Sequence, residues 1–156
     1  MGLAFTFHCK ECGHNLKFYF GTGAMYPEKY QEIINDALIG KLGAEIQKFL
    51  IEHPNGAIDI SRVLANCENC GHHEMVRDLT MYLPKEDFSQ DKSYPLTWEL
   101  REHYKVFEKY NHECSYCGEP VEVVTAENFF DRKIVLRCPN CESEMFPRKS
   151  ASKHWD

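Results

Sequence analysis

The alternation of apolar and polar residues predicts a series of short β-strands. Residues 4–8 and 16–20 alternate with a period of two, which is typical of strands. Similar segments, rich in β-branched or large apolar side chains, follow at residues 57–65, 75–83, 121–124, 134–136 and 143–146.

Between residues 27 and 50 the period changes to that of an amphipathic helix. Pro27 suits a first helical turn, and apolar residues recur every three or four positions from Tyr30 onward. Gly40 and Gly43 interrupt this pattern, so we predict one broken helix or two short ones. We expect the apolar stripe to pack on the protein's own strands, although a partner-binding face is the alternative.

A further helix is predicted to begin at Thr97 and to end before Asn111. Leu100, Tyr104 and Phe107 would share one side of it. We expect Trp98 and Tyr104 to lie in the core.

All eight cysteines fall in Cys-x-x-Cys units, which we number from first to fourth along the chain: Cys9 and Cys12, Cys67 and Cys70, Cys114 and Cys117, Cys138 and Cys141. Two thiolates three residues apart suit one tetrahedral metal ion, with Zn–S bonds of about 2.3 Å. A redox Cys-x-x-Cys motif usually occurs once, at a helix start, and a disulfide framework would not require such close pairs. The pattern therefore predicts two four-cysteine sites and two Zn²⁺ ions per chain.

Three of the four units are followed directly by a glycine, namely Gly13, Gly71 and Gly118. Glycine allows the positive φ with which a chain curls around a metal ion. We call each unit with its two following residues a knuckle; the fourth departs from the pattern because Glu142 follows Cys141.

Four knuckles can be paired in three ways. The 20 residues between Cys117 and Cys138 fit the usual spacing of a four-cysteine zinc site, so we pair the third knuckle with the fourth. The first then pairs with the second, across the 54 residues between Cys12 and Cys67. A crossed arrangement, with the first knuckle paired to the third, stays open.

This pairing predicts an α+β fold, with two small zinc-ribbon β units in series and a helical insert in the first. We expect residues 1–84 to form the first unit, the polar residues 85–95 a linker, residues 96–147 a helix with the second ribbon, and residues 148–156 a flexible tail. Each half is small, so bound metal would decide whether it folds.

Strands closed around two Cys-x-x-Cys units resemble zinc ribbons, and residues 114–118 with 138–141 match that family well. Residues 5–84 resemble the bacterial CpXC-type domain, although Lys10 and Glu68 stand where that family has proline. The resemblance implies an architecture rather than an activity.

Charge and composition favour a binding module over several other functions. The formal net charge of −6 argues against a general nucleic-acid coat, and no apolar run could span a membrane. Sites closed by four cysteines leave no open position for a substrate, and no phosphate-binding loop or His-Glu-x-x-His motif occurs. We therefore expect a protein that is not an enzyme and binds another macromolecule, most simply a protein.

Nucleic acid is the main alternative partner. A cluster of basic residues supports it, and Phe129, Phe130 and Trp155 could stack on bases. The basic candidates are Arg132, Lys133, Arg137, Arg148 and Lys149.

Two other metal chemistries are weaker alternatives. The second half also resembles rubredoxin-like iron electron carriers, except that Glu142 replaces an expected glycine. A histidine beside a knuckle could replace a cysteine and open a catalytic site; the candidates are His8, His14, His72, His73 and His112.

The beginning of the sequence bears on the compartment. Residues 1–8 lack the basic region, apolar run and cleavage site of a secretory signal, so we expect a cytoplasmic protein with reduced thiols.

Overall fold

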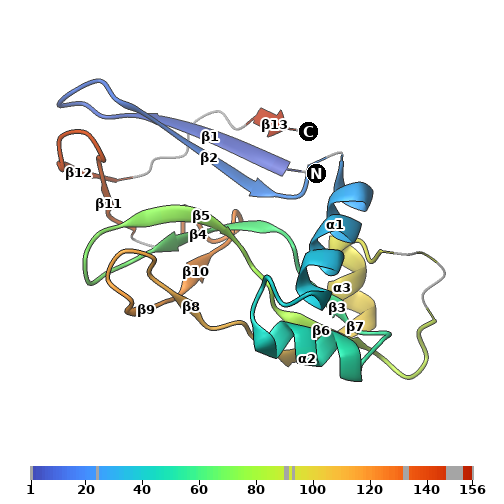
Figure 1. The fold of residues 1–156 in the computed structure, drawn as a ribbon. Helices are drawn as coiled ribbons and strands as arrows, with labels where there is room; N and C mark the ends of the chain where they lie inside the picture. The colour runs from blue at the N-terminus through green and yellow to red at the C-terminus, as the bar shows by residue number, and fades with distance from the viewer. Residues whose placement is uncertain are drawn as a thin grey trace. The chain divides into compact units, whose positions relative to one another are not determined.

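The computed structural model describes residues 2–23, 25–89, 92, 94–131, 134–146 and 153–155. Three helices and several small antiparallel sheets in this part of the chain give the predicted α+β class (Figure 1). The chain forms two compact units. We call residues 1–24, 62–77 and 111–156 the cysteine unit, and residues 25–61 and 78–110 the helical unit.

These units interleave along the sequence, whereas we expected units that follow one another. The predicted helical insert is a compact unit of its own, and it also takes in residues 85–95 and the helix after them. All four knuckles lie in the cysteine unit.

The main sheet of the cysteine unit has the strand order β10-β4-β2-β1-β13, and β5 pairs with β4. Its strands are β1 (Gly2–His8), β2 (Asn15–Gly21), β4 (Arg62–Asn66), β5 (His73–Arg77), β10 (Val123–Val124) and β13 (Lys153–Trp155). The two predicted strands around the first knuckle are therefore confirmed. β13 pairs with β1 and lies in the range expected to be a flexible tail.

Two shorter hairpins complete this unit: β8 (His112–Glu113) with β9 (Pro120–Val121), and β11 (Leu136–Arg137) with β12 (Glu144–Met145). Each of the four hairpins closes on a residue pair seven positions apart: His8 and Asn15, Asn66 and His73, Glu113 and Pro120, Arg137 and Glu144. Each knuckle is therefore the loop of an equivalent hairpin.

Aromatic side chains form the core of the cysteine unit. Phe129, from the loop after β10, is fully buried, and its ring lies 5.0–5.8 Å from five other phenylalanine rings. Those rings belong to Phe5, Phe7, Phe18, Phe20 and Phe130. The suggestion that Phe129 stacks on bases is therefore wrong, because its ring is enclosed by the sheet. The side chain of Trp155 lies outside the described part.

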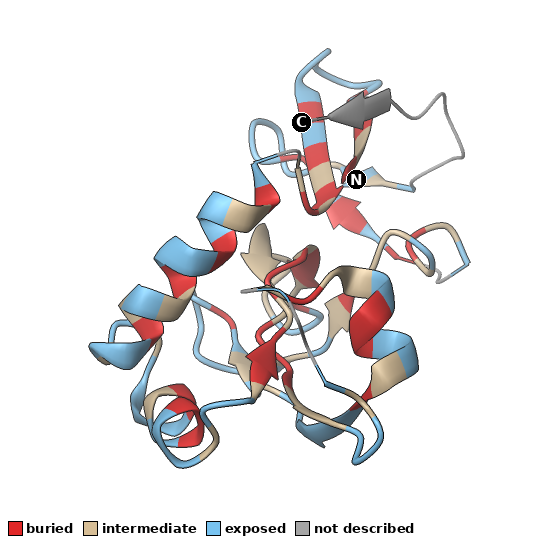
Figure 2. Cartoon of the chain, turned by 90° about the vertical axis from the view of Figure 1, so that its right-hand side faces the viewer, coloured by how far each residue is buried: buried red, intermediate tan, exposed pale blue. Residues whose placement is uncertain are grey.

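The helical unit begins with α1 (Tyr26–Leu38) and α2 (Ala44–Glu52), so the interrupted pattern marks two helices. Gly40 and Gly43 have φ angles of 84° and 99°, which end the first helix and turn the chain into the second. Figure 2 shows the buried residues of α1 along one face. As expected, most of the apolar stripe packs within its own unit, although Leu38 is 41% exposed. The buried residues of the two helices are Tyr26, Tyr30, Ile33, Ala37, Ile46, Phe49 and Leu50.

The rest of this unit is a three-stranded sheet, β3 (Ala57–Ile58), β6 (Met81–Pro84) and β7 (Tyr104–Glu108), with helix α3 (Thr97–His103). Residues 57–65 and 75–83 are each two strands rather than one; the second pair is separated at Leu79, whose φ is 61°.

Two expectations for residues 97–110 are wrong. The helix ends at His103, because Tyr104 has extended backbone angles and pairs with Pro84 in the sheet. Trp98 is 52% exposed and does not lie in the core, whereas Tyr104 is buried as expected. No helix among the described residues could cross a membrane.

Candidate metal centres

The eight cysteines form two groups whose four sulfur atoms lie within 4.8 Å of one another. Site A consists of Cys9, Cys12, Cys138 and Cys141, and site B consists of Cys67, Cys70, Cys114 and Cys117. In each site, two sulfur pairs between knuckles are 3.5 and 3.6 Å apart. A tetrahedral ion with metal–sulfur bonds of about 2.3 Å needs sulfurs about 3.8 Å apart, so both groups fit such an ion.

The predicted pairing of the knuckles is wrong. The first pairs with the fourth and the second with the third, so the sites are nested along the chain. Strand β10 explains this arrangement: Val123 and Val124 pair with Ala65 and Leu64 of β4, which holds the third knuckle beside the second. Figure 1 shows β12, which follows the fourth knuckle, near the loop that joins β1 and β2.

All four knuckles share one backbone geometry. In each knuckle, the N–H of the residue directly after the second cysteine donates to the carbonyl of the first cysteine at 2.8–2.9 Å. These donors are Gly13, Gly71, Gly118 and Glu142. These four residues have φ angles between 62° and 78°. Glu142 therefore occupies the glycine position in the left-handed conformation, at the conformational cost that a side chain imposes there.

Replacing Glu142 with glycine is expected to stabilise the metal-loaded protein by roughly 0.5–1 kcal/mol, because glycine adopts positive φ without strain. Urea unfolding would measure this change. Gly118→Ala is the matched control: its φ is 78° and an added Cβ meets no atom within 4 Å. This control should destabilise the protein by about 1 kcal/mol through backbone strain alone. A loss of stability in Glu142→Gly would contradict the shared geometry.

Side chains from the knuckles surround the sulfur atoms. In site A the Ser143 hydroxyl lies 2.9 Å from Cys141 Sγ and 3.3 Å from Cys9 Sγ. In site B the Asn69 amide donates to Cys117 Sγ at 3.6 Å. Asn140 occupies the same knuckle position as Asn69, and its side chain lowers the pKa of Cys12. These residues were not predicted from the sequence, although an asparagine at the same knuckle position in both sites was a visible signal.

The thiols of each site differ in acidity. The hydrogen bond from Ser143 lowers the pKa of Cys9 to about 6. The backbone N–H of Glu119, together with Asn69, lowers the pKa of Cys117 to about 6. Burial, with the neighbouring thiols Cys12 and Cys9, raises the pKa of Cys138 to about 11. At neutral pH some of these cysteines would therefore bind a metal ion directly as thiolates, whereas others would have to release a proton before they bind.

Removal of the Ser143 hydroxyl should make site A more sensitive to acid. The lowered pKa keeps Cys9 as a thiolate down to about pH 6. Ser143→Ala removes that effect, so protons compete with the metal ion for the Cys9 sulfur at a higher pH. The affinity of site A for its metal ion should therefore fall roughly tenfold at neutral pH. Metal release during acid titration, followed with a chromogenic chelator, measures the change. Ser115→Ala is the control, because its hydroxyl lies 3.3 Å from His72 Nε2 rather than near sulfur; equal release curves for both variants would contradict the role of Ser143.

No histidine joins either group of ligands in the part of the chain that the structure describes. His72 instead stacks on Tyr116, with ring centroids 6.0 Å apart. His73 is half-buried beside Phe18, and burial lowers the pKa of its imidazole. Both sites are thus closed by cysteines alone.

Only one of the five predicted nucleic-acid-binding residues lies in the described part. Arg137 is exposed, and its side chain covers Gly71 so closely that a Cβ there would approach its Cδ to 2.6 Å. The other four, Arg132, Lys133, Arg148 and Lys149, lie outside the described residues.

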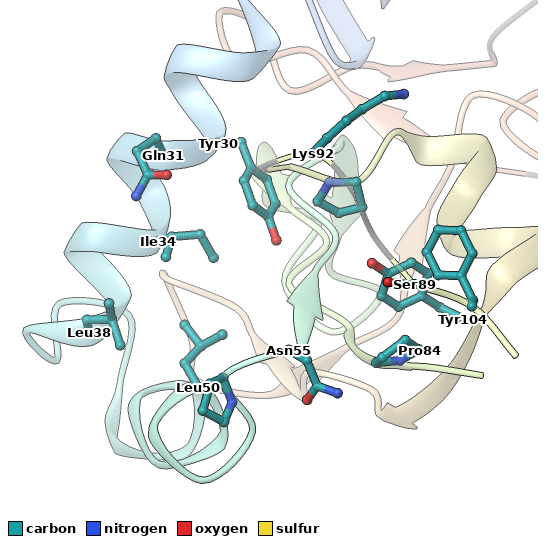
Figure 3. Close-up of a pocket in the computed structure, with 14 residues that line it drawn as sticks. Tyr30, Gln31, Ile34, Leu38, Leu50, Asn55, Pro84, Ser89, Lys92 and Tyr104 are labelled. Atoms are coloured by element: carbon teal, nitrogen blue, oxygen red, sulfur yellow. The ribbon is translucent and has the colours of Figure 1, made fainter. Parts of the chain in front are cut away.

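Each unit also has a cavity that the sequence did not indicate. The cavity of the helical unit has a volume of about 690 Å³. Figure 3 shows Ile34, Leu38 and Leu50 along one side of it and Pro84 and Tyr104 along the other. The cavity of the cysteine unit lies beside site B and has a volume of about 660 Å³.

Comparisons with protein-family models, curated proteins and solved structures found no match. The geometry of this chain alone therefore indicates the metal centres. They are two closed four-cysteine groups, each able to hold a metal ion.

Proposed function

We propose that this chain is a zinc-stabilised module that binds another protein and has no enzymatic activity of its own. The observation that carries this proposal is the pair of closed four-cysteine groups, sites A and B. A metal ion held by four cysteines has no open position for water or substrate, so it acts structurally.

Four-thiolate coordination suits either zinc or iron. Zinc is the proposal because both sites combine hairpins in the manner of zinc ribbons, and a structural role needs no redox change. The rubredoxin-like alternative would give a red protein. The resemblance of residues 5–84 to the CpXC-type domain stays a hypothesis, since no family model matches.

A protein partner is favoured over nucleic acid by the surroundings of site B. Four glutamates and one arginine line the cavity beside this site. Carboxylates repel the phosphate backbone, whose neutralisation by basic residues normally dominates nucleic-acid binding. Phe129, one of the three aromatic residues predicted as candidates for base stacking, is buried.

Elemental analysis of freshly purified protein, with thiols counted after denaturation, tests the metal. Two zinc ions and eight free thiols per chain are expected. Capture experiments with metal-loaded protein and with protein stripped by a chelator then test the binding role. A protein partner retained only by the metal-loaded form supports the proposal, whereas iron, disulfides or retention of nucleic acid alone would overturn it.

A further inference from the structure

Beside site B the cysteine unit has an open groove of about 660 Å³, a volume within the range of ligand-binding sites. Its walls come from the second knuckle, from the segment after the third knuckle and from the β11–β12 hairpin. Two of its apolar lining residues, Val124 and Ile134, are buried, so the groove has a firm apolar floor.

Acidic side chains surround this floor, and we call the site the acidic groove. Its charged lining residues are Glu68, Glu119, Glu122, Glu144 and Arg137. All five are exposed. Within the described part of the chain, Glu68, Glu119 and Glu144 form no ion pair.

Site B adds further negative charge. Cys67, one of its ligands, also lines the groove. Four thiolates around a divalent ion carry a net charge of −2, which acts on any group that enters beside them.

Asn66 forms part of the groove wall, and its amide nitrogen donates to the carbonyl of Val135 at 3.3 Å. Its Oδ1 is buried and therefore contacts no ligand in the groove. The exposed carboxylates, with the thiolates beside them, select a cationic ligand.

We propose that the acidic groove binds an extended, arginine- or lysine-rich segment of a partner protein. This inference rests on the proposed protein-binding function and names the chemistry of the partner. Long basic side chains suit the site because their aliphatic stems can cover the apolar floor while their charged ends reach the carboxylates.

Fluorescence anisotropy tests this proposal with the zinc-loaded 156-residue chain and a short labelled peptide that contains several arginines. The triple variant Glu68→Gln, Glu119→Gln, Glu144→Gln should weaken binding at least about tenfold, since each exposed charge pair contributes modestly and the three add. The control is Glu28→Gln, Glu45→Gln, Glu86→Gln: these are exposed glutamates of the helical unit, and the variant changes net charge equally. Its affinity should stay within about twofold, because none of these three glutamates lines the groove.

A peptide with citrulline in place of arginine should bind weakly, because citrulline keeps donors but lacks the charge. Equal losses in the two triple variants would overturn the proposal by showing attraction to net charge alone. Displacement of the peptide by an equal concentration of spermine would also overturn it and would assign a polyamine ligand. If the peptide does not bind but the zinc-loaded protein still captures a partner in a metal-dependent manner, only the groove assignment fails and the proposed function stands.

Discussion

The double variant Cys9→Ser, Cys138→Ser is expected to keep one metal ion per chain, whereas Cys9→Ser, Cys67→Ser should keep none. In the first variant both changes fall in site A, so site B stays complete. In the second, each site loses one ligand. The sequence-based pairing predicts the reverse result, because it places Cys9 and Cys67 in the same site. Metal content per chain, measured by elemental analysis, therefore decides between the two pairings.

The effect on stability should be large. Structural zinc contributes about 10–16 kcal/mol of apparent binding free energy, which equals or exceeds the stability of a typical domain, about 5–15 kcal/mol. Loss of either site should therefore lower the melting temperature sharply.

Melting temperatures of the single and double variants give a second test of the pairing. Within one site, the second cysteine change should add little to the first, because the metal is already lost. When the two changes fall in different sites, their effects on the melting temperature should add. Additive losses for Cys9→Ser with Cys138→Ser would contradict site A.

The local elements of this fold could be predicted because their signals lie within a few residues. The alternation around Cys9 marks β1 and β2, and the spacing from Tyr30 marks α1. The cysteine spacing alone indicated two four-ligand sites. Each of these features depends on neighbours along the chain.

The pairing of the knuckles depends instead on contacts between distant segments. The 20-residue spacing before Cys138 allowed the third and fourth knuckles to meet. The pairing of Val123 with Ala65 places the third knuckle beside the second instead. No local sequence pattern indicates this contact between distant strands.

Ambiguous periodicity explains the misplaced end of α3. Leu100, Tyr104 and Phe107 are spaced like one helix face, yet β-branched and aromatic residues from position 104 onward also suit a strand. Pairing with β6 decides in favour of β7. Phe107 then lies beside Phe49, with ring centroids 5.0 Å apart, and stays half-exposed.

Truncation of Phe129 to alanine should cost the cysteine unit about 3–5 kcal/mol, the usual loss for a buried phenylalanine. Its ring is fully buried and meets five other aromatic rings, so a cavity would open at the centre of the core. That loss is comparable to the whole stability of a small domain. Urea unfolding of the metal-loaded protein measures it.

Phe146→Ala is the control for this prediction, because Phe146 is 66% exposed and its truncation should change stability by no more than about 0.5 kcal/mol. Retention of both metal ions by Phe129→Ala would separate core packing from ligand loss, since neither site contains an aromatic ligand. If Phe129→Ala were as stable as Phe146→Ala, the loop after β10 would not anchor the core. The constraint that holds the third knuckle beside the second would then rest on the short pairing of β10 with β4 alone.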